Sequence, residues 1–139
     1  MRIILDTNIL LAALIKDSLT RKIIIKSGWK FFYPYAALDE IKKYESLILE
    51  KSELTQSQYQ DLLEKITSYI NFVQQNALDP FIDEANSIIG NIDKNDVIFA
   101  ASALAVENDG IWSDDTYFEK QSHIKVRKTV EILSLLKDI

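Results

Sequence analysis

The sequence contains no cysteine and a single histidine among its 139 residues. Without cysteine it can form no disulfide, no thiolate zinc site and no cysteine nucleophile. One histidine excludes a multi-histidine metal site, and His123 lies among polar residues late in the chain, which is typical of a surface position. These absences restrict the available chemistry to carboxylates and other oxygen ligands.

Glycine, proline and long apolar runs are also scarce. Three glycines and two prolines exclude a collagen-like, linker-like or low-complexity chain. The longest apolar stretch, residues 9–15, is far shorter than the roughly 20 residues that cross a bilayer, and no secretion signal is recognisable. Since 47% of the residues are hydrophobic, we expect one cytoplasmic domain over residues 1–139, with no membrane contact.

The charge is unevenly distributed along the chain. Residues 1–52 hold nine Lys and Arg against six Asp and Glu, a net charge of +3, whereas residues 53–139 hold seven against fifteen, a net charge of −8. Four basic side chains that follow the first predicted strand could contact nucleic-acid phosphates, although a solvated helix face is the alternative: Lys16, Arg21, Lys22 and Lys26.

The hydrophobic pattern predicts strands that alternate with helices. Short apolar runs predict strands at residues 1–5, 29–33, 71–73, 111–112 and near 126. Helical spacing predicts helices at residues 9–14, from 18 or 20 to 25, at 37–51, 55–70, 82–89 and 94–107, and from 129 onward. This order predicts an α/β fold with a mostly parallel sheet and an extended helical pair after the second strand.

Capping residues predict where several helices begin and end. Ser18 or Thr20 can cap the second helix, and Gly28 follows its end. Thr55 and Gln58 have the spacing of a capping box. A further cap is predicted at Thr129, at the start of the last helix.

Two acidic residues lie at or just after the ends of predicted strands. Asp6 comes after the first strand and Asp115 comes shortly after the fourth. In open parallel sheets, ligands bind outside the carboxyl ends of the strands, so we expect these carboxylates to lie in a site. Helix capping is the alternative role for Asp6, and a local turn is the alternative for Asn8.

Helix geometry distinguishes Glu40 from Asp39. At about 100° per residue, Glu40 flanks an apolar arc of the helix, whereas Asp39 lies nearly opposite that arc. The arc consists of Leu38, Ile41, Tyr44 and Ile48. We therefore expect Glu40 to lean toward the sheet and Asp39 to face water, with a solvated surface charge as the alternative for Glu40.

Asp93 and Asp96 open the predicted apolar helix. Asp93 fits its N-cap, where the helix dipole favours an acid. Asp96 fits its first turn, which the following apolar residues predict to be buried, and a buried charge requires a partner. If Asp6, Glu40, Asp96 and Asp115 converge, their repulsion raises their pKa values. A divalent cation such as Mg²⁺ or Mn²⁺ would compensate that repulsion.

Four segments together resemble the PIN domain, a family of metal-dependent ribonucleases. They are LDTNILLAAL at residues 5–14, LDEIKKY at 38–44, DKNDVIFAASALA at 93–105 and WSDDTYF at 112–118. The resemblance implies a five-stranded parallel sheet flanked by helices. Within the family the chain is most similar to the VapC-type toxins of prokaryotic toxin–antitoxin pairs. That branch implies cleavage of RNA, a small antitoxin partner and a homodimer.

The resemblance also implies roles for individual residues. The catalytic, metal-binding acids correspond to Asp6, Glu40, Asp96 and Asp115, the accessory acid to Asp93, and the supporting polar residues to Asn8 and Ser113. Asp114 stands where the family often has an amide, which leaves open whether Asp114, Asp115 or both face the metal. The implied reaction is hydrolysis of RNA phosphodiester bonds with Mg²⁺ or Mn²⁺.

Two other enzyme classes also begin with an apolar strand or place acids at strand ends. A haloacid dehalogenase-type phosphatase requires a second Asp where this chain has Asn8, and a receiver domain requires a Lys where Ser113 and Asp114 stand. Both are therefore disfavoured. Two further alternatives stay open: an RNA-processing nuclease without an antitoxin, and a catalytically silent PIN-fold module for RNA binding or assembly.

Overall fold

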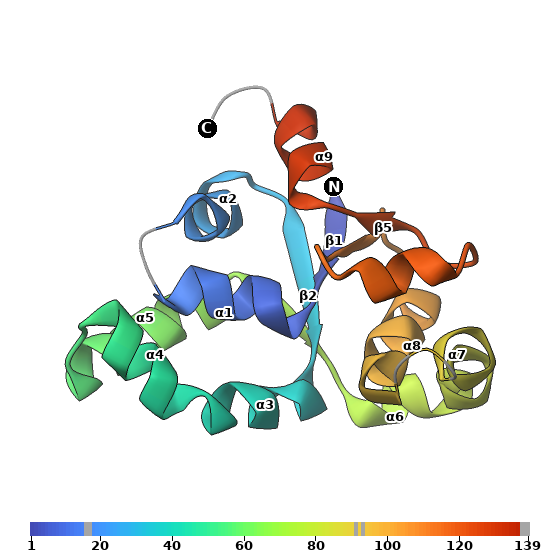
Figure 1. Ribbon diagram of the computed structural model, residues 1–139, viewed down its shortest axis with the longest axis horizontal. Coiled ribbons are helices and arrows are strands. Elements are labelled where there is room, and N and C mark those ends of the chain that lie inside the picture. The colour runs from blue at the N-terminus through green and yellow to red at the C-terminus, as the bar shows by residue number, and fades with distance from the viewer. Residues whose placement is uncertain (16–17, 91, 93, 137–139) are drawn as a thin grey trace.

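The computed structural model describes residues 1–15, 18–90, 92 and 94–136, and its centre is a five-stranded sheet (Figure 1). The strands are β1 (Arg2–Leu5), β2 (Lys30–Pro34), β3 (Ile70–Val73), β4 (Ile111–Trp112) and β5 (Val126–Arg127). They pair in the order β3-β2-β1-β4-β5, and every neighbouring pair is parallel. The predicted α/β fold with a five-stranded parallel sheet is confirmed.

Helices flank the sheet on two sides, with α1 to α5 on one side and α6 to α8 on the other (Figure 1). The α-helices are α1 (Thr7–Ile15), α2 (Leu19–Lys26), α3 (Leu38–Lys43), α4 (Glu45–Ser52), α5 (Gln56–Thr67), α6 (Gln75–Leu78), α7 (Ile82–Ile89), α8 (Val97–Ala105) and α9 (Thr129–Leu135). Short 3₁₀ helices are η1 (Tyr35–Ala37), η2 (Asp79–Phe81), η3 (Lys94–Asp96) and η4 (Thr116–Lys120). In the described part of the chain, no helix has the length and apolar character needed to cross a membrane.

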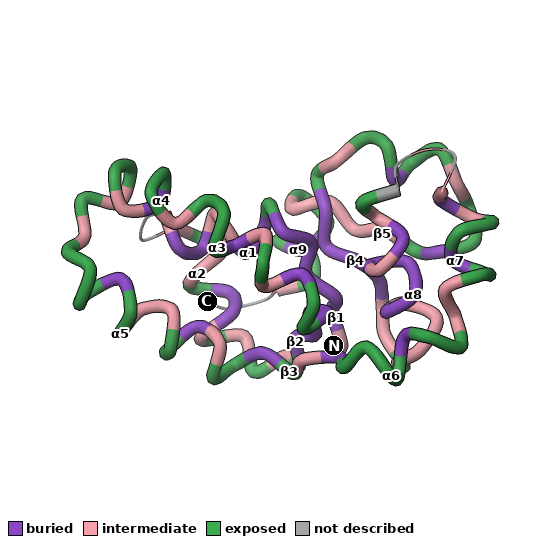
Figure 2. The backbone as a smooth tube through the Cα atoms, turned by 90° about the horizontal axis from the view of Figure 1, so that it is seen from below, coloured by how far each residue is buried: buried purple, intermediate pink, exposed green. Residues whose placement is uncertain are grey.

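In the central strand β1, Ile3, Ile4 and Leu5 are completely buried, as their apolar run predicted, whereas Arg2 at its start is half-buried. Ile4 pairs with Phe32 of β2 on one side and with Ile111 of β4 on the other. Figure 2 shows that buried residues concentrate in these inner strands and in the helix faces turned toward them. Burial on both faces holds the carboxyl end of β1 rigidly at one edge of the sheet.

Two capping predictions are confirmed and one is wrong. Ser18 caps α2 by accepting the N–H of Arg21, and Thr55 and Gln58 form the capping box of α5. Thr129, however, is the first residue of α9, and Lys128 holds the N-cap position. The reason is tertiary: the carboxylate of Asp114, which follows β4, receives the N–H of Thr129 in place of a local cap.

The helical pair after β2 is more divided than its pattern predicted. The helix expected at residues 37–51 is interrupted at Tyr44, which separates α3 from α4. Tyr44 therefore points to solvent and does not join the apolar arc. The helix expected to reach Ile70 ends at Thr67, because Ile70 pairs with Phe31 as the first residue of β3.

The helix expected at residues 94–107 is also shorter than predicted. Residues 94–96 form the 3₁₀ helix η3, and α8 ends at Ala105. Asp96 therefore occupies the N-cap position of α8, not its first turn. The sequence pattern missed α6, η2 and η4 altogether, since elements of three to five residues carry too few turns to show a period.

Candidate active site

The carboxyl ends of β1 and β4 lie side by side at the point where the connections of the sheet change direction. The chain moves outward from β1 through β2 to β3, and then returns to the other side of β1 as β4. Open α/β sheets bind ligands at such a switch point. Asp6 continues β1 by donating its N–H to the carbonyl of Trp112, and the N–H of Ser113 donates to Arg127. The sheet itself therefore positions both residues.

Asp6 is a buried carboxylate among other acids. Only 6% of its surface is exposed, and its Oδ1 accepts the N–H of Ile9 at 2.8 Å. The pKa of Asp6 is raised from an ordinary value of 3.8 to about 6, chiefly by burial and in smaller part by the nearby carboxylates of Asp115 and Asp114. Hydrogen bonds from Ser113 and Ile9 offset part of this effect. Asp6 thus caps α1 and also faces a cluster of like charge.

A cavity of about 320 Å³ opens beside Asp6. Its lining comprises Asp6, Asn8, Ile9, Ala12, Thr20, Asp114, Asp115 and Thr129. Four of the residues singled out from the sequence, Asp6, Asn8, Asp114 and Asp115, are therefore brought together although more than 100 positions separate the two pairs. We call this space the acidic cavity.

The two neighbouring acids after β4 are held in different ways. Asp114 binds the start of α9: its Oδ1 accepts the N–H of Thr129 at 2.8 Å and its Oδ2 accepts the Thr129 hydroxyl at 2.6 Å. The same hydroxyl accepts the indole N–H of Trp112 at 2.9 Å. Both oxygens of Asp114 therefore serve to fasten α9 to the end of β4.

Asp115 is held by hydrogen bonds to the residues two positions before and after it. Its Oδ1 accepts the N–H of Tyr117 at 2.9 Å and so caps η4, while its own N–H donates to the Ser113 hydroxyl at 3.1 Å. That buried hydroxyl uses its proton on the carboxylate of Asp6. Ser113 therefore links the backbone of Asp115 to the side chain of Asp6.

Glu40 does not line the acidic cavity, and its link to the site is an electrostatic effect on a tyrosine that the sequence analysis did not single out. Tyr33, at the end of β2, is completely buried and donates its hydroxyl proton to the carbonyl of Ala37 at 3.1 Å. The Thr7 hydroxyl, 2.9 Å away, must then donate to Tyr33, because a phenol has one proton. Burial raises the pKa of Tyr33, and the charges of Glu40 and Asp6 raise it further.

Tyr33 therefore lies within the electrostatic reach of both Glu40 and Asp6. Glu40 is half-buried on α3 whereas Asp39 is exposed, as the helix geometry predicted. The signal that could have identified Tyr33 and Thr7 was their position near the carboxyl ends of buried strands: Thr7 directly follows Asp6 after β1, and Tyr33 is the last residue but one of β2.

Asp96 stands half-buried at the start of α8. One turn later on that helix, the ring of Phe99 packs edge-on against Tyr33, with 5.7 Å between ring centroids. The beginning of α8 therefore approaches the end of β2, next to the site. Asp93 and Lys16, two further predicted site residues, lie outside the described residues.

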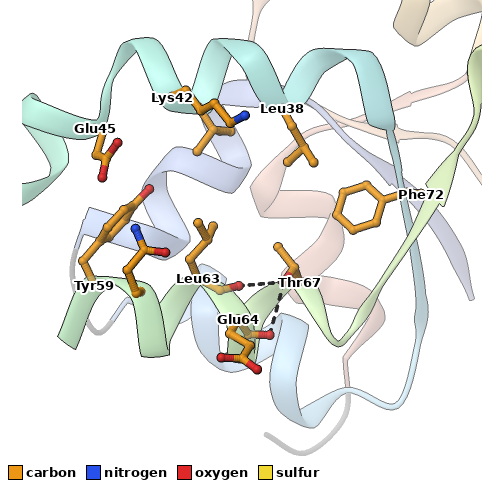
Figure 3. Close-up of a pocket in the computed structure, with 10 residues that line it drawn as sticks. Leu38, Lys42, Glu45, Tyr59, Leu63, Glu64, Thr67 and Phe72 are labelled. Atoms are coloured by element: carbon orange, nitrogen blue, oxygen red, sulfur yellow. Dashed lines mark hydrogen bonds between the residues drawn. The ribbon is translucent and has the colours of Figure 1, made fainter. Parts of the chain in front are cut away.

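The other predicted basic residues do not line the acidic cavity. Arg21, Lys22 and Lys26 line a separate groove between α2 and α5, together with Lys65. A third cavity of about 590 Å³ lies between α3, α4 and α5 and has largely apolar walls such as Leu38, Leu63 and Phe72 (Figure 3). None of the predicted site residues that the structure describes lines this third cavity.

The donors around the acidic cavity fit a hard divalent cation. They are carboxylate, amide and hydroxyl oxygens, and a cation would relieve the repulsion that raises the pKa of Asp6. Among the described residues, no three acidic or histidine side chains are close enough to chelate an ion as they stand.

Comparison with known families gives one result. A family model described as PIN domain matches residues 4–137, almost the whole chain. No significant match was found among curated proteins or among solved structures. The matched range includes every described residue of the acidic cavity.

Proposed function

The chain belongs to the PIN domain family, and from this premise we propose that it is a Mg²⁺- or Mn²⁺-dependent endoribonuclease. The observation that supports this most is Asp6: a buried carboxylate at the end of the central strand, with a raised pKa, facing Asp114 and Asp115 across an open cavity. Such repulsion lowers the stability of the folded protein. Acidic residues with shifted pKa values are concentrated at functional sites.

The proposed metal ligands are Asp6 and Asp115, with Asp96, Glu40 and Asp93 acting directly or through water. When bound there, a divalent cation would lower the pKa of a water molecule and stabilise the leaving oxygen of the phosphodiester. Asp114 already gives both oxygens to Thr129, so we assign it chiefly to the anchoring of α9.

The remaining residues of the site hold these acids and contact the substrate. The Ser113 hydroxyl and the Ile9 N–H fix the orientation of the Asp6 carboxylate. Asn8 is exposed at the cavity and can donate its amide to a phosphate oxygen. Tyr33 and Thr7 form the buried support between Asp6 and Glu40.

The proposal is tested by cleavage of a mixed RNA pool in Mg²⁺ or Mn²⁺. We expect Asp6→Asn and Asp115→Asn to reduce the rate on the order of 100-fold or more, since each removes a carboxylate that is proposed to hold the cation, and the cation would stabilise the negative charge of the transition state. Glu40→Gln is expected to reduce the rate as well, whereas the matched control Asp39→Asn, on the exposed face of the same helix, leaves it unchanged. RNA that stays intact with either metal contradicts the proposal and favours a silent RNA-binding or assembly module.

We further propose that the enzyme is the toxin of a VapC-type toxin–antitoxin pair, acts in the cytoplasm and forms a homodimer. The support is the resemblance of the four acid-bearing segments to that branch. Expression of the chain alone should arrest growth, and co-expression of the adjacent reading frame should relieve the arrest. An active nuclease whose toxicity and activity never respond to that partner would instead be an RNA-processing enzyme.

A further inference from the structure

Helix α2 separates two cavities of opposite character. Thr20 lines the acidic cavity, whereas its neighbours Leu19 and Arg21 line the groove between α2 and α5. We call the latter the basic groove; its volume is about 670 Å³. Because adjacent residues of one helical turn belong to the two linings, the first turn of α2 lies between the two cavities.

Four cationic side chains of the described part of the chain line the basic groove. Arg21, Lys22 and Lys26 come from α2 and Lys65 comes from the facing helix α5, and no described acidic side chain takes part in the lining. Lys22, Lys26 and Lys65 are exposed, and within the described residues they form no ion pair. The sequence pattern did not indicate Lys65, because only the packing of α5 against α2 brings it there.

The arrangement of these cations follows the axis of α2. Lys22 and Lys26 are four residues apart, so they lie on one face about 6 Å from each other along the helix. At the end nearer the acidic cavity, Arg21 donates its Nε to the carbonyl of Ala13 at 2.7 Å, which holds the guanidinium in place. A row of positive charge thus leads away from the acidic cavity.

We infer that the basic groove binds the phosphate backbone of the single-stranded RNA that continues from the cleaved bond. The inference rests on the proposed function, because it takes the acidic cavity as the cleavage site. Among the residues that the structure describes, the lining holds no aromatic side chain on which a base could stack and no Asn or Gln that could read a base edge. Binding in the groove therefore depends on charge and is insensitive to sequence.

The test measures RNA binding without cleavage. A fluorescein-labelled 20-nucleotide RNA is titrated with the full chain in EDTA, by anisotropy at several salt concentrations. The variant Lys22→Ala/Lys26→Ala/Lys65→Ala is expected to bind about tenfold more weakly. The slope of its log affinity against log salt concentration should become less negative by about 2. Each of the three lost phosphate contacts contributes about 0.7 on a single strand. Lys125→Ala, an exposed lysine before β5, is the control and should match the unmodified chain.

A second measurement separates this inference from the proposed function. In Mg²⁺ or Mn²⁺ the triple variant should cleave with a raised KM and an unchanged kcat, because the acidic cavity is intact. If neither protein cleaves but the lysines still govern binding, the groove assignment stands and the nuclease proposal fails.

If cleavage persists while the lysine variant keeps its affinity and salt slope, the groove assignment is overturned. An acidic peptide is the competing occupant, and polyglutamate serves as its probe. Polyglutamate that displaces the RNA at lower concentration than unlabelled RNA does would also overturn the inference.

Discussion

The charged form of Asp6 lowers the free energy of unfolding of the protein. Its raised pKa means that the folded protein holds a proton there more tightly than the unfolded chain does. Between pH 3.8 and about 6 the native state therefore binds more protons, and the contribution of Asp6 to stability falls as the pH rises. The difference between the two pKa values corresponds to about 3 kcal/mol, which sets the order of magnitude of the loss above pH 6.

This predicts that Asp6→Asn stabilises the protein in the absence of metal. The amide can still accept the N–H of Ile9 but carries no charge to repel Asp114 and Asp115. In EDTA we expect a gain of about 1–3 kcal/mol at pH 7 that disappears below pH 4. Urea unfolding at pH 4, 5 and 7 measures it, with Asp39→Asn as the control. A variant less stable than the unmodified chain at pH 7 would contradict the conclusion that the charge of Asp6 destabilises the fold.

At the level of elements, the junction between β4 and α9 depends on one hydroxyl. The Thr129 hydroxyl donates to Asp114 and accepts from the indole of the buried Trp112. This single oxygen therefore connects α9 to β4 and to the residues that follow β4. Lys128 gives α9 no side-chain cap, so Asp114 and Thr129 supply the hydrogen bonds that hold the start of this helix.

Thr129→Val keeps the shape of the side chain but removes the hydroxyl. The Trp112 N–H then has no partner, and we expect a loss of about 1–3 kcal/mol in the free energy of unfolding. Thr129→Ser restores the hydroxyl and should recover most of that loss. The comparison is made by urea unfolding at pH 7. Equal stability of the Val and Ser variants would show that the hydroxyl does not hold α9.

At the scale of the whole molecule, the acidic cavity joins segments from both ends of the chain. Asp6 and Asn8 come from the first ten residues and Asp114, Asp115 and Thr129 from the last thirty. A ligand that binds this cavity bridges β1, α1, β4 and α9, so its binding energy adds to the global stability of the fold.

Divalent cations are therefore expected to raise the melting temperature. At a concentration of 100 times its dissociation constant, a cation bound only by the folded state adds about 2.7 kcal/mol. We expect Mg²⁺ or Mn²⁺ to stabilise the unmodified chain and Asp39→Asn alike, and to have little effect on Asp6→Asn. Thermal unfolding with and without the cation measures this. An equal rise in the Asp6 variant would place the bound cation elsewhere.

Much of the fold could be predicted because its strongest signals are local. The apolar run that forms β1, the capping box at Thr55 and the apolar helix after Asp96 each carry their structure in a few neighbouring residues. The errors have tertiary causes: Ile70 leaves the helical pattern to pair with Phe31, and Asp114 replaces a local cap at Thr129.

The sequence by itself determined which residues are acidic, that Asp6 and Asp115 follow strands, and that Glu40 leans inward while Asp39 does not. Those properties depend on residue type and on the fixed geometry of strands and helices. Only the tertiary structure decided that Asp114 fastens α9, that the charges of Asp6 and Glu40 both act on Tyr33, and that Lys65 lines a basic groove. These depend on which distant segments pack together, and that follows from the burial of the whole core and not from any short stretch of chain.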